Sequence, residues 1–136
     1  MTIDELNKIK EAVSILDTAK FDREQRRIII MACKYKLSAE AISIFADKAF
    51  DHLKMKEIMT ATMNIPLDIV RRYAKPEYSL SLLTSVFSDY RLVGLSVEDI
   101  DEYVECWQNW KECNQRRFNA LERFRNKKGN KNNERK

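Results

Sequence analysis

The sequence contains very few of the residues that reverse a chain. Only 2 glycines and 2 prolines occur among its 136 residues. A β-sandwich or a β-barrel of this length needs many more, because each strand reversal uses Gly, Pro, Asn or Asp in a tight turn. These architectures are therefore excluded, and the sequence predicts an all-α fold.

Catalytic and metal-binding motifs are also missing. The sequence has no glycine-rich phosphate loop, no GxSxG, no HExxH and no CxxC, and its single histidine, His52, has no obvious relay partner. Three cysteines, an odd number, suit a reducing compartment; they are Cys33, Cys106 and Cys113. We interpret them as small buried hydrophobic residues, because two thiolates without further ligands make a poor zinc site. We expect no enzyme activity, no cofactor and no metal.

Long hydrophobic runs are absent as well. No stretch approaches the length of a membrane-spanning helix, and the N-terminal segment MTIDELNKIKEAV carries acids too early for a signal peptide. Hydrophobic residues make up 44% of the chain and charged residues 34%, which fits a domain with one core and charged faces. We expect a cytoplasmic protein that does not contact a membrane.

The helices that the sequence predicts have recognisable beginnings. Thr2 with Glu5, and Asp22 with Gln25, form capping-box patterns that open helices reaching about residues 18 and 35. Ser38, Ser79 and Ser96 are expected to cap later helices, and Pro66 opens another. These helices are expected at 38–46, 51–63, 66–74, 79–90 and 96–125, the last one without a breaker.

An internal repeat organises these helices. The segments LSAEAISIFA, IPLDIVRRYA and LSVEDIDEYV, which begin at Leu37, Ile65 and Leu95, share an apolar residue, a cap or proline, an acid, a β-branched residue and an aromatic residue. Each follows a longer helix, and the first two units are 28 or 29 residues apart. We predict three helix-turn-helix hairpin repeats in a compact bundle or short solenoid. The divisions are a capping helix at 1–20, repeats ending in a long helix at 21–126, and a disordered basic tail at 127–136.

The acids of this repeat do not form a catalytic set. Glu40, Asp68 and Glu98 lie near the starts of the short helices, where they complement the positive end of the helix dipole. General acid–base catalysis needs convergent groups with shifted pKa values, which nothing in this pattern supplies. We interpret all of them as structural.

The repeat also carries a resemblance. The sequence resembles short helical-hairpin repeats in uncharacterised proteins of Firmicutes mobile elements and phages. The resemblance lies in the pattern FDxxQ…LSxExIxxFA, which begins at Phe21, and in the segment YAKPEY from Tyr73 to Tyr78. The likeness covers residues 21 to about 104, its motif is loose, and the third unit lacks the Ala-x-Pro exit. The resemblance implies a mobile-element accessory protein, including one that disarms a host defence nuclease as small anti-CRISPR proteins do.

A second resemblance points to nucleic acid. LSAEAISIFADKAFDHLKMKEIM is similar to a DNA-binding helix-turn-helix, whose second helix must present exposed donors to phosphates and base edges. Here that helix offers His52, Lys54 and Lys56 against Asp51 and Glu57. The corresponding helix of the next unit, SLSLLTSVFSDY, contains no base. We favour a structural hairpin and keep a nucleic-acid-binding regulator as the alternative.

Charge is distributed unevenly along the chain. Residues 1–115 contain 16 basic and 19 acidic side chains, a net charge of −3, whereas residues 116–136 contain 9 basic and 2 acidic ones, a net charge of +7. One interpretation is an arm that binds phosphates of RNA or DNA, or an acidic or nucleic-acid-binding protein. Alternatively, the bases favour the helix dipole and the polar tail only solubilises the chain end. Both interpretations stay open.

The last helix carries an aromatic stripe in the same region. Tyr103, Trp107 and Trp110 are expected to close the core, and the part beyond Cys113 is expected to form an amphipathic contact surface for a protein partner. Its residues are Arg116, Arg117, Phe118, Leu121, Arg123, Phe124, Arg125, Lys127 and Lys128. Alternatively, this helix folds back and buries the stripe itself.

Overall fold

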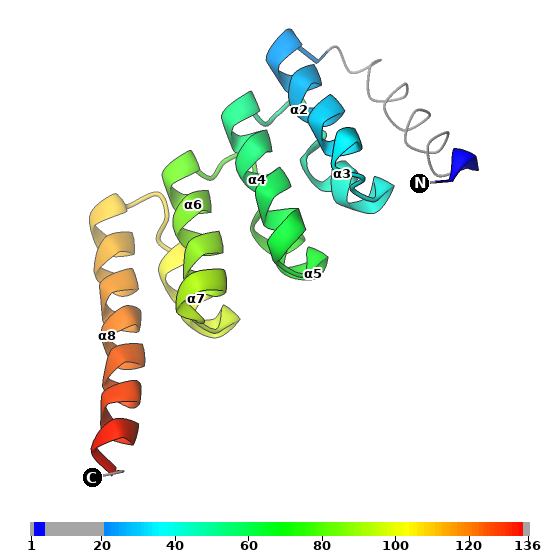
Figure 1. Cartoon of the computed structure of the whole chain (residues 1–136). Helices are drawn as coiled ribbons and strands as arrows, with labels where there is room; N and C mark the ends of the chain where they lie inside the picture. The colour runs from blue at the N-terminus through cyan, green and yellow to red at the C-terminus, as the bar shows by residue number, and fades with distance from the viewer. Residues whose placement is uncertain (1, 5–20, 135–136) are drawn as a thin grey trace. The chain divides into compact units, whose positions relative to one another are not determined.

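A computed structural model describes residues 2–4 and 21–134, with side chains as far as Lys127 (Figure 1). These residues form helices and connecting turns without a β-strand, which confirms the all-α prediction. The predicted capping helix at residues 1–20 lies outside the described residues apart from its first turn. The chain divides into two compact units between Thr84 and Ser85, which we call the N-terminal and the C-terminal unit.

The helices of the N-terminal unit begin where the sequence predicts. They are α2 (Arg23–Lys34), α3 (Ala39–Phe45), α4 (His52–Asn64) and α5 (Leu67–Tyr73), followed by α6 (Leu80–Ser88), which crosses the division between the units. Asp22 and Gln25 form both hydrogen bonds of the predicted capping box. Ser38 accepts from the Ala41 N–H, and Asp51 accepts from the Lys54 N–H at 2.8 Å. Local caps therefore define these helix starts.

The core of the N-terminal unit lies around α4. This helix packs against α2, α3 and α5, and each of the four helices contributes apolar side chains that are almost completely buried. They include Ile29, Ala32, Ile42, Phe45, Met55, Ile58, Met59, Val70 and Tyr73. The β-branched and aromatic positions of the predicted repeat thus point into one core.

Two loops of this unit have the same hydrogen bonds at an offset of 28 residues. In the first, the Ala46 N–H donates to the Ile42 carbonyl and the Phe50 N–H donates to the Asp47 carbonyl. In the second, the Ala74 N–H donates to Val70 and the Tyr78 N–H donates to Lys75. The ring that ends each loop, Phe50 or Tyr78, is buried. The two hairpins of this unit therefore leave their short helices through one type of loop.

The C-terminal unit departs from the predicted helix boundaries. It contains the end of α6, a π-helical turn η1 (Asp89–Val93), α7 (Val97–Val104) and α8 (Trp110–Glu134). The prediction of one unbroken helix at 96–125 is wrong, because residues 105–109 form a turn. Helix α7 ends at Val104, and Asn109 starts the next helix: its side-chain oxygen caps α8 by accepting from the Glu112 N–H at 3.3 Å.

The end of α8 also differs from the prediction. Its backbone is helical as far as Glu134, beyond the expected end near residue 125 and into the segment predicted to be a disordered tail. Figure 1 shows α8 as one continuous helix in orange and red. The helix therefore includes the backbone of every residue in the predicted contact surface.

The helix predicted to end near Tyr90 changes at Ser88 into the π-helical turn, which continues to Val93. The N–H groups of Gly94 and Leu95 both donate to the Asp89 carbonyl, at 2.9 and 3.0 Å. Gly94 has a φ of 87°, a left-handed conformation that glycine adopts without the steric cost other residues carry. One of the two glycines is thus required to end this turn and lead the chain into α7.

Candidate binding surface on the C-terminal helix

Helix α8 packs against α7 inside the C-terminal unit. Ile100, Tyr103 and Val104 of α7 are buried, as are Cys113 and Ala120 of α8. The turn at residues 105–109 therefore makes α8 fold back on α7 instead of extending it. One side of α8 is therefore buried against α7, and only its other sides can form a binding surface.

A buried carboxylate joins three elements of this unit. Asp89 of η1 is only 1% exposed. Its oxygens accept two hydrogen bonds from Arg117 of α8, at 2.7 and 2.8 Å, and one from the Tyr103 hydroxyl of α7 at 2.9 Å. The hydrogen bond with Asp89 raises the pKa of Arg117. A two-pronged guanidinium–carboxylate pair is the strong form of this contact, so Arg117 holds the fold together rather than pointing to a partner.

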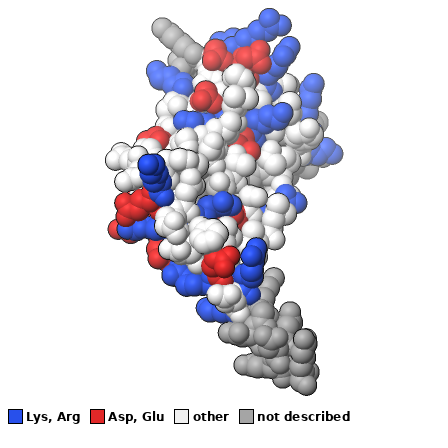
Figure 2. All heavy atoms as spheres, turned by 90° about the vertical axis from the view of Figure 1, so that its left-hand side faces the viewer, with Lys and Arg blue, Asp and Glu red and all other residues white. Residues whose placement is uncertain are grey.

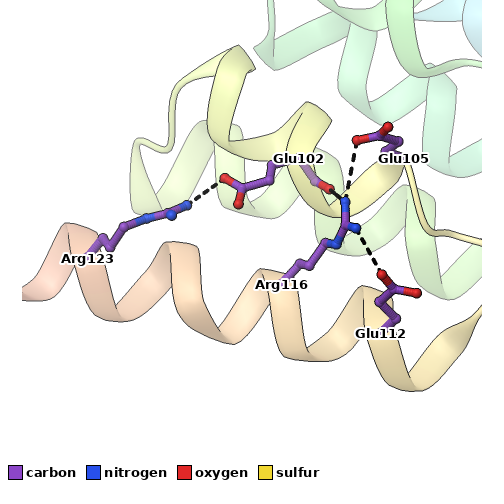
Figure 3. Close-up of polar contacts among 5 residues, drawn as sticks. All are labelled: Glu102, Glu105, Glu112, Arg116 and Arg123. Atoms are coloured by element: carbon purple, nitrogen blue, oxygen red, sulfur yellow. Dashed lines mark hydrogen bonds and ion pairs between the residues drawn. The ribbon is translucent and has the colours of Figure 1, made fainter.

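Two further arginines of α8 pair with acids of the same unit (Figure 3). Arg116 donates to the Glu102 carbonyl at 3.1 Å, and its guanidinium pairs with Glu105 at 3.4 Å and Glu112 at 2.9 Å. Arg123 pairs with Glu102 at 2.7 Å, a hydrogen bond that raises the pKa of Arg123, and lies 3.6 Å from Asp99. Exposed pairs of this kind stabilise little. Their main effect is to neutralise much of the positive charge that the sequence shows on this helix.

The remaining residues of the predicted surface are placed differently. Phe124 is half-buried, and its ring lies 3.8 Å from where a Cβ on Gly94 would be. Arg125 is 81% exposed and pairs only at 3.5 Å with Glu122. Lys127 is exposed, whereas the Lys128 side chain lies outside the described residues. The structure therefore separates the predicted set into residues that pack on the unit and residues that face outward.

One flank of α8 keeps large apolar side chains in contact with solvent. Trp110 is 51% and Phe118 is 57% exposed, and Leu121 is half-buried. Positions 110, 114, 118, 121 and 125 follow one another at three or four residues, a spacing that brings side chains to the same side of a helix. We call Trp110, Asn114, Phe118, Leu121 and Arg125 the aromatic flank. The prediction that Trp110 lies in the core is wrong. It assumed one unbroken helix, whereas the turn at residues 105–109 makes Trp110 the first residue of α8.

Acidic and basic side chains are interspersed on the molecular surface. On the face drawn in Figure 2, Lys and Arg side chains lie next to Asp and Glu side chains at several places. Within the C-terminal unit, the ion pairs of Arg116 and Arg123 also bring opposite charges together. Mixed charge of this kind gives a weaker attraction for phosphate chains than a surface of one sign.

The second helix of the DNA-binding resemblance is α4. Lys54, one of its expected donors, gives its ammonium hydrogen bond to the Pro76 carbonyl at 3.0 Å. His52 is half-buried, and Lys56 is exposed. Met55 and Ile58 face the core. A helix that reads DNA needs several exposed donors. The contacts of α4 thus favour the interpretation as a structural hairpin.

The cysteines have environments that suppress thiolate chemistry. Burial raises the pKa of the Cys113 thiol, and the neighbouring Cys106 raises it further. Burial also raises the pKa of Cys33. A raised pKa lowers the fraction of thiolate, the form that binds metals and acts as a nucleophile. Among residues 2–4 and 21–127, no three His, Cys, Asp or Glu side chains are grouped so as to hold a metal ion.

The described helices also lack the apolar length of a membrane span. No protein-family model matches the chain, and no curated protein or solved structure matches it significantly. The resemblance to mobile-element hairpin repeats accordingly stays a prediction.

Proposed function

We propose that this chain is a non-enzymatic helical protein that acts by binding another protein through the aromatic flank of α8. The observation that carries this proposal is the exposure of Trp110 and Phe118 on one side of a helix whose other side packs on α7. Exposed aromatic side chains bring large contact areas at low entropy cost, and Trp and Tyr with Arg dominate the energetic centres of protein interfaces. Arg125 lies on the same flank.

The pairing of the arginines supports a protein partner over nucleic acid. Binding to phosphates depends on several Lys and Arg side chains that release counterions. Arg116, Arg117 and Arg123 already pair with carboxylates of this unit. Of the predicted set, this leaves Arg125 and Lys127 as the outward bases among the described side chains. A nucleic-acid-binding regulator that uses the basic C-terminal segment is the alternative proposal.

The resemblance supplies a more specific form of the proposal. A phage or mobile-element protein of this size that blocks a host nuclease complex, as anti-CRISPR proteins do, needs a stable surface and no catalytic groups. An all-α scaffold with a rigid aromatic helix flank fits that requirement. We therefore propose inhibition of a defence nuclease complex as the specific activity.

Two measurements test the proposed function. The first is fluorescence anisotropy with labelled random duplex and single-stranded DNA and RNA at low salt, where we expect no binding. Binding that weakens steeply as salt rises would instead establish the nucleic-acid alternative. The second is affinity capture of partners by the full chain, by Phe118→Ala and by Asn126→Ala, an exposed position of α8 outside the aromatic flank. We expect only Phe118→Ala to lose them, and retention by that variant would refute the surface.

A further inference from the structure

We infer that the aromatic flank of α8 binds an acidic amphipathic helix of its partner. This inference rests on the proposed function and adds the chemistry of the bound segment. Three observations carry it: the way α8 already packs with α7, the charges beside the aromatic flank, and the repulsion that a second copy of this flank would meet.

Helix α7 shows what kind of helix α8 accepts. Along its inner side α7 buries Ile100, Tyr103 and Val104, and among residues 97–105 it has acids but no base. Two of its acids pair with arginines of α8: Glu102 with Arg123, and Asp99 at a longer distance with the same guanidinium. Glu105, just after the helix, pairs with Arg116. One side of α8 is thus a binding surface for an acidic amphipathic helix within this chain.

The aromatic flank offers the same combination of groups without a helix on it. Trp110, Phe118 and Leu121 form an apolar stripe about 16 Å long, from a rise of about 1.5 Å per residue. Lys111 and Arg125 lie beside this stripe, and no carboxylate in the described part of the chain pairs with Lys111. The pair of Arg125 with Glu122 is exposed and 3.5 Å long, so it is easily exchanged. Apolar residues flanked by acids therefore complement this surface.

A second copy of the chain does not complement it. An antiparallel contact centred on Phe118 would place Arg125 of one copy opposite Lys111 of the other, and a parallel contact would place each base opposite itself. Like charges opposed across a contact cost free energy and suppress that pairing. Asn114 in the middle of the stripe is a polar group of the type that selects register and partner in helix pairs. The charges thus favour a different, acidic chain.

The experiment is a selection followed by matched affinity measurements. A displayed library of random peptides of about 18 residues, long enough to form a helix on binding, is selected against the full chain. We expect the recovered peptides to have apolar residues at helical spacing and a net negative charge. In fluorescence anisotropy, Phe118→Ala should weaken a recovered peptide by at least about tenfold, a loss of about 1.4 kcal/mol.

Two charge-reversal variants measure the electrostatic contribution to peptide binding. Arg125→Glu changes the aromatic flank, whereas Lys127→Glu makes the same change in charge on the other side of α8. We expect several-fold weaker peptide binding for Arg125→Glu and little change for Lys127→Glu, with unchanged helicity by circular dichroism for both. Equal effects of the two reversals would show that only net charge matters and would overturn the inference.

Other outcomes overturn the inference but not the proposed function. Recovered peptides that are basic, proline-rich or extended, or a selection that recovers none, would exclude an acidic helix as the bound segment. A concentration-dependent dimer that Phe118→Ala abolishes would assign the flank to a second copy. Partner capture that still depends on Phe118 would leave the proposed protein-binding function intact. Partner capture that does not depend on Phe118 would refute both the inference and the proposed binding surface.

Discussion

Each unit holds its helices partly through a buried polar side chain, Gln25 in the N-terminal unit and Asp89 in the C-terminal unit. In the N-terminal unit, side chains bind backbone carbonyls: Gln25 donates to the Phe50 carbonyl at 2.7 Å and the Lys48 carbonyl at 3.2 Å, and Lys54 donates to Pro76. In the C-terminal unit, helices are joined through ion pairs, with the buried Asp89–Arg117 pair at the centre. Both units also have exposed ion pairs, such as that of Arg71 with Glu40 between α5 and α3. The difference lies in the buried group: an amide that binds backbone carbonyls in the first unit, and a carboxylate that pairs with an arginine in the second.

The comparison of α4 with α8 shows why the candidate surface lies where it does. Both helices begin at a capping Asp or Asn, Asp51 or Asn109, after a loop that follows a short helix. Helix α4 packs against three other helices of its unit. Helix α8 packs against α7 and leaves Trp110 and Phe118 more than half exposed. Helix α8 has no short helix after it in the described residues, and its apolar flank is therefore exposed to solvent.

The largest expected effect concerns the buried ion pair. Arg117→Ala leaves the Asp89 carboxylate buried with only the Tyr103 hydroxyl as a side-chain donor. Breaking a buried pair costs 3–5 kcal/mol, and we expect about 3 kcal/mol of the free energy of unfolding because the Arg117 side chain is one-third exposed. Urea denaturation followed by circular dichroism measures this loss. The control is Arg123→Ala, which removes exposed pairs and should cost far less; equal losses would contradict the contrast between buried and surface pairs.

A smaller effect is expected in the N-terminal unit. Gln25→Ala leaves the buried Phe50 carbonyl without its side-chain donor and also removes one arm of the capping box of α2. An unsatisfied buried acceptor costs about 1–3 kcal/mol, so we expect about 2 kcal/mol in the same denaturation experiment. Lys54→Met keeps the aliphatic length and removes one part-buried hydrogen bond, which should cost about 1 kcal/mol or less. A larger loss for Lys54→Met than for Gln25→Ala would reverse this ranking.

An effect about as small as that of Lys54→Met is expected at the turn that leads into α7. Gly94→Ala places a side chain at a φ of 87°, and left-handed backbone costs a residue with a Cβ about 1–2 kcal/mol. The new Cβ would lie 3.8 Å from the Phe124 ring, an ordinary contact, so we expect only the backbone cost of about 1 kcal/mol. A thermal melt detects it as a lower midpoint. A loss as large as that of Arg117→Ala would show that the Phe124 contact is tighter than this distance implies.

Much of the fold was predictable because helix starts are local. Asp22, Ser38 and Asp51 cap the N–H of the residue three positions later, a contact that depends on nothing outside the segment. The missed turn had a local signal too: Asn109 is a good capping residue, but the apolar pattern around it continues across the break. Because the apolar spacing is continuous, it predicts one helix where the structure has α7 and α8.

The candidate site was predictable only in part. The predicted contact surface includes Phe118 and Arg125, which are exposed, but also Arg116, Arg117 and Arg123, whose carboxylate partners lie up to 28 residues away. It also left Trp110 in the core. Nothing near an arginine in the sequence distinguishes a guanidinium that faces an acid of another helix from one that faces solvent.

Composition, capping residues and apolar spacing were sufficient for the all-α fold and for most helix starts, because these depend on chain entropy and on contacts within a few residues. The division of α8 into a side that packs on α7 and an aromatic flank required the folded chain. Adjacent residues of a helix point about 100° apart, so the helix that packs against α8 determines which side chains are buried, which charges are paired and which side chains stay exposed.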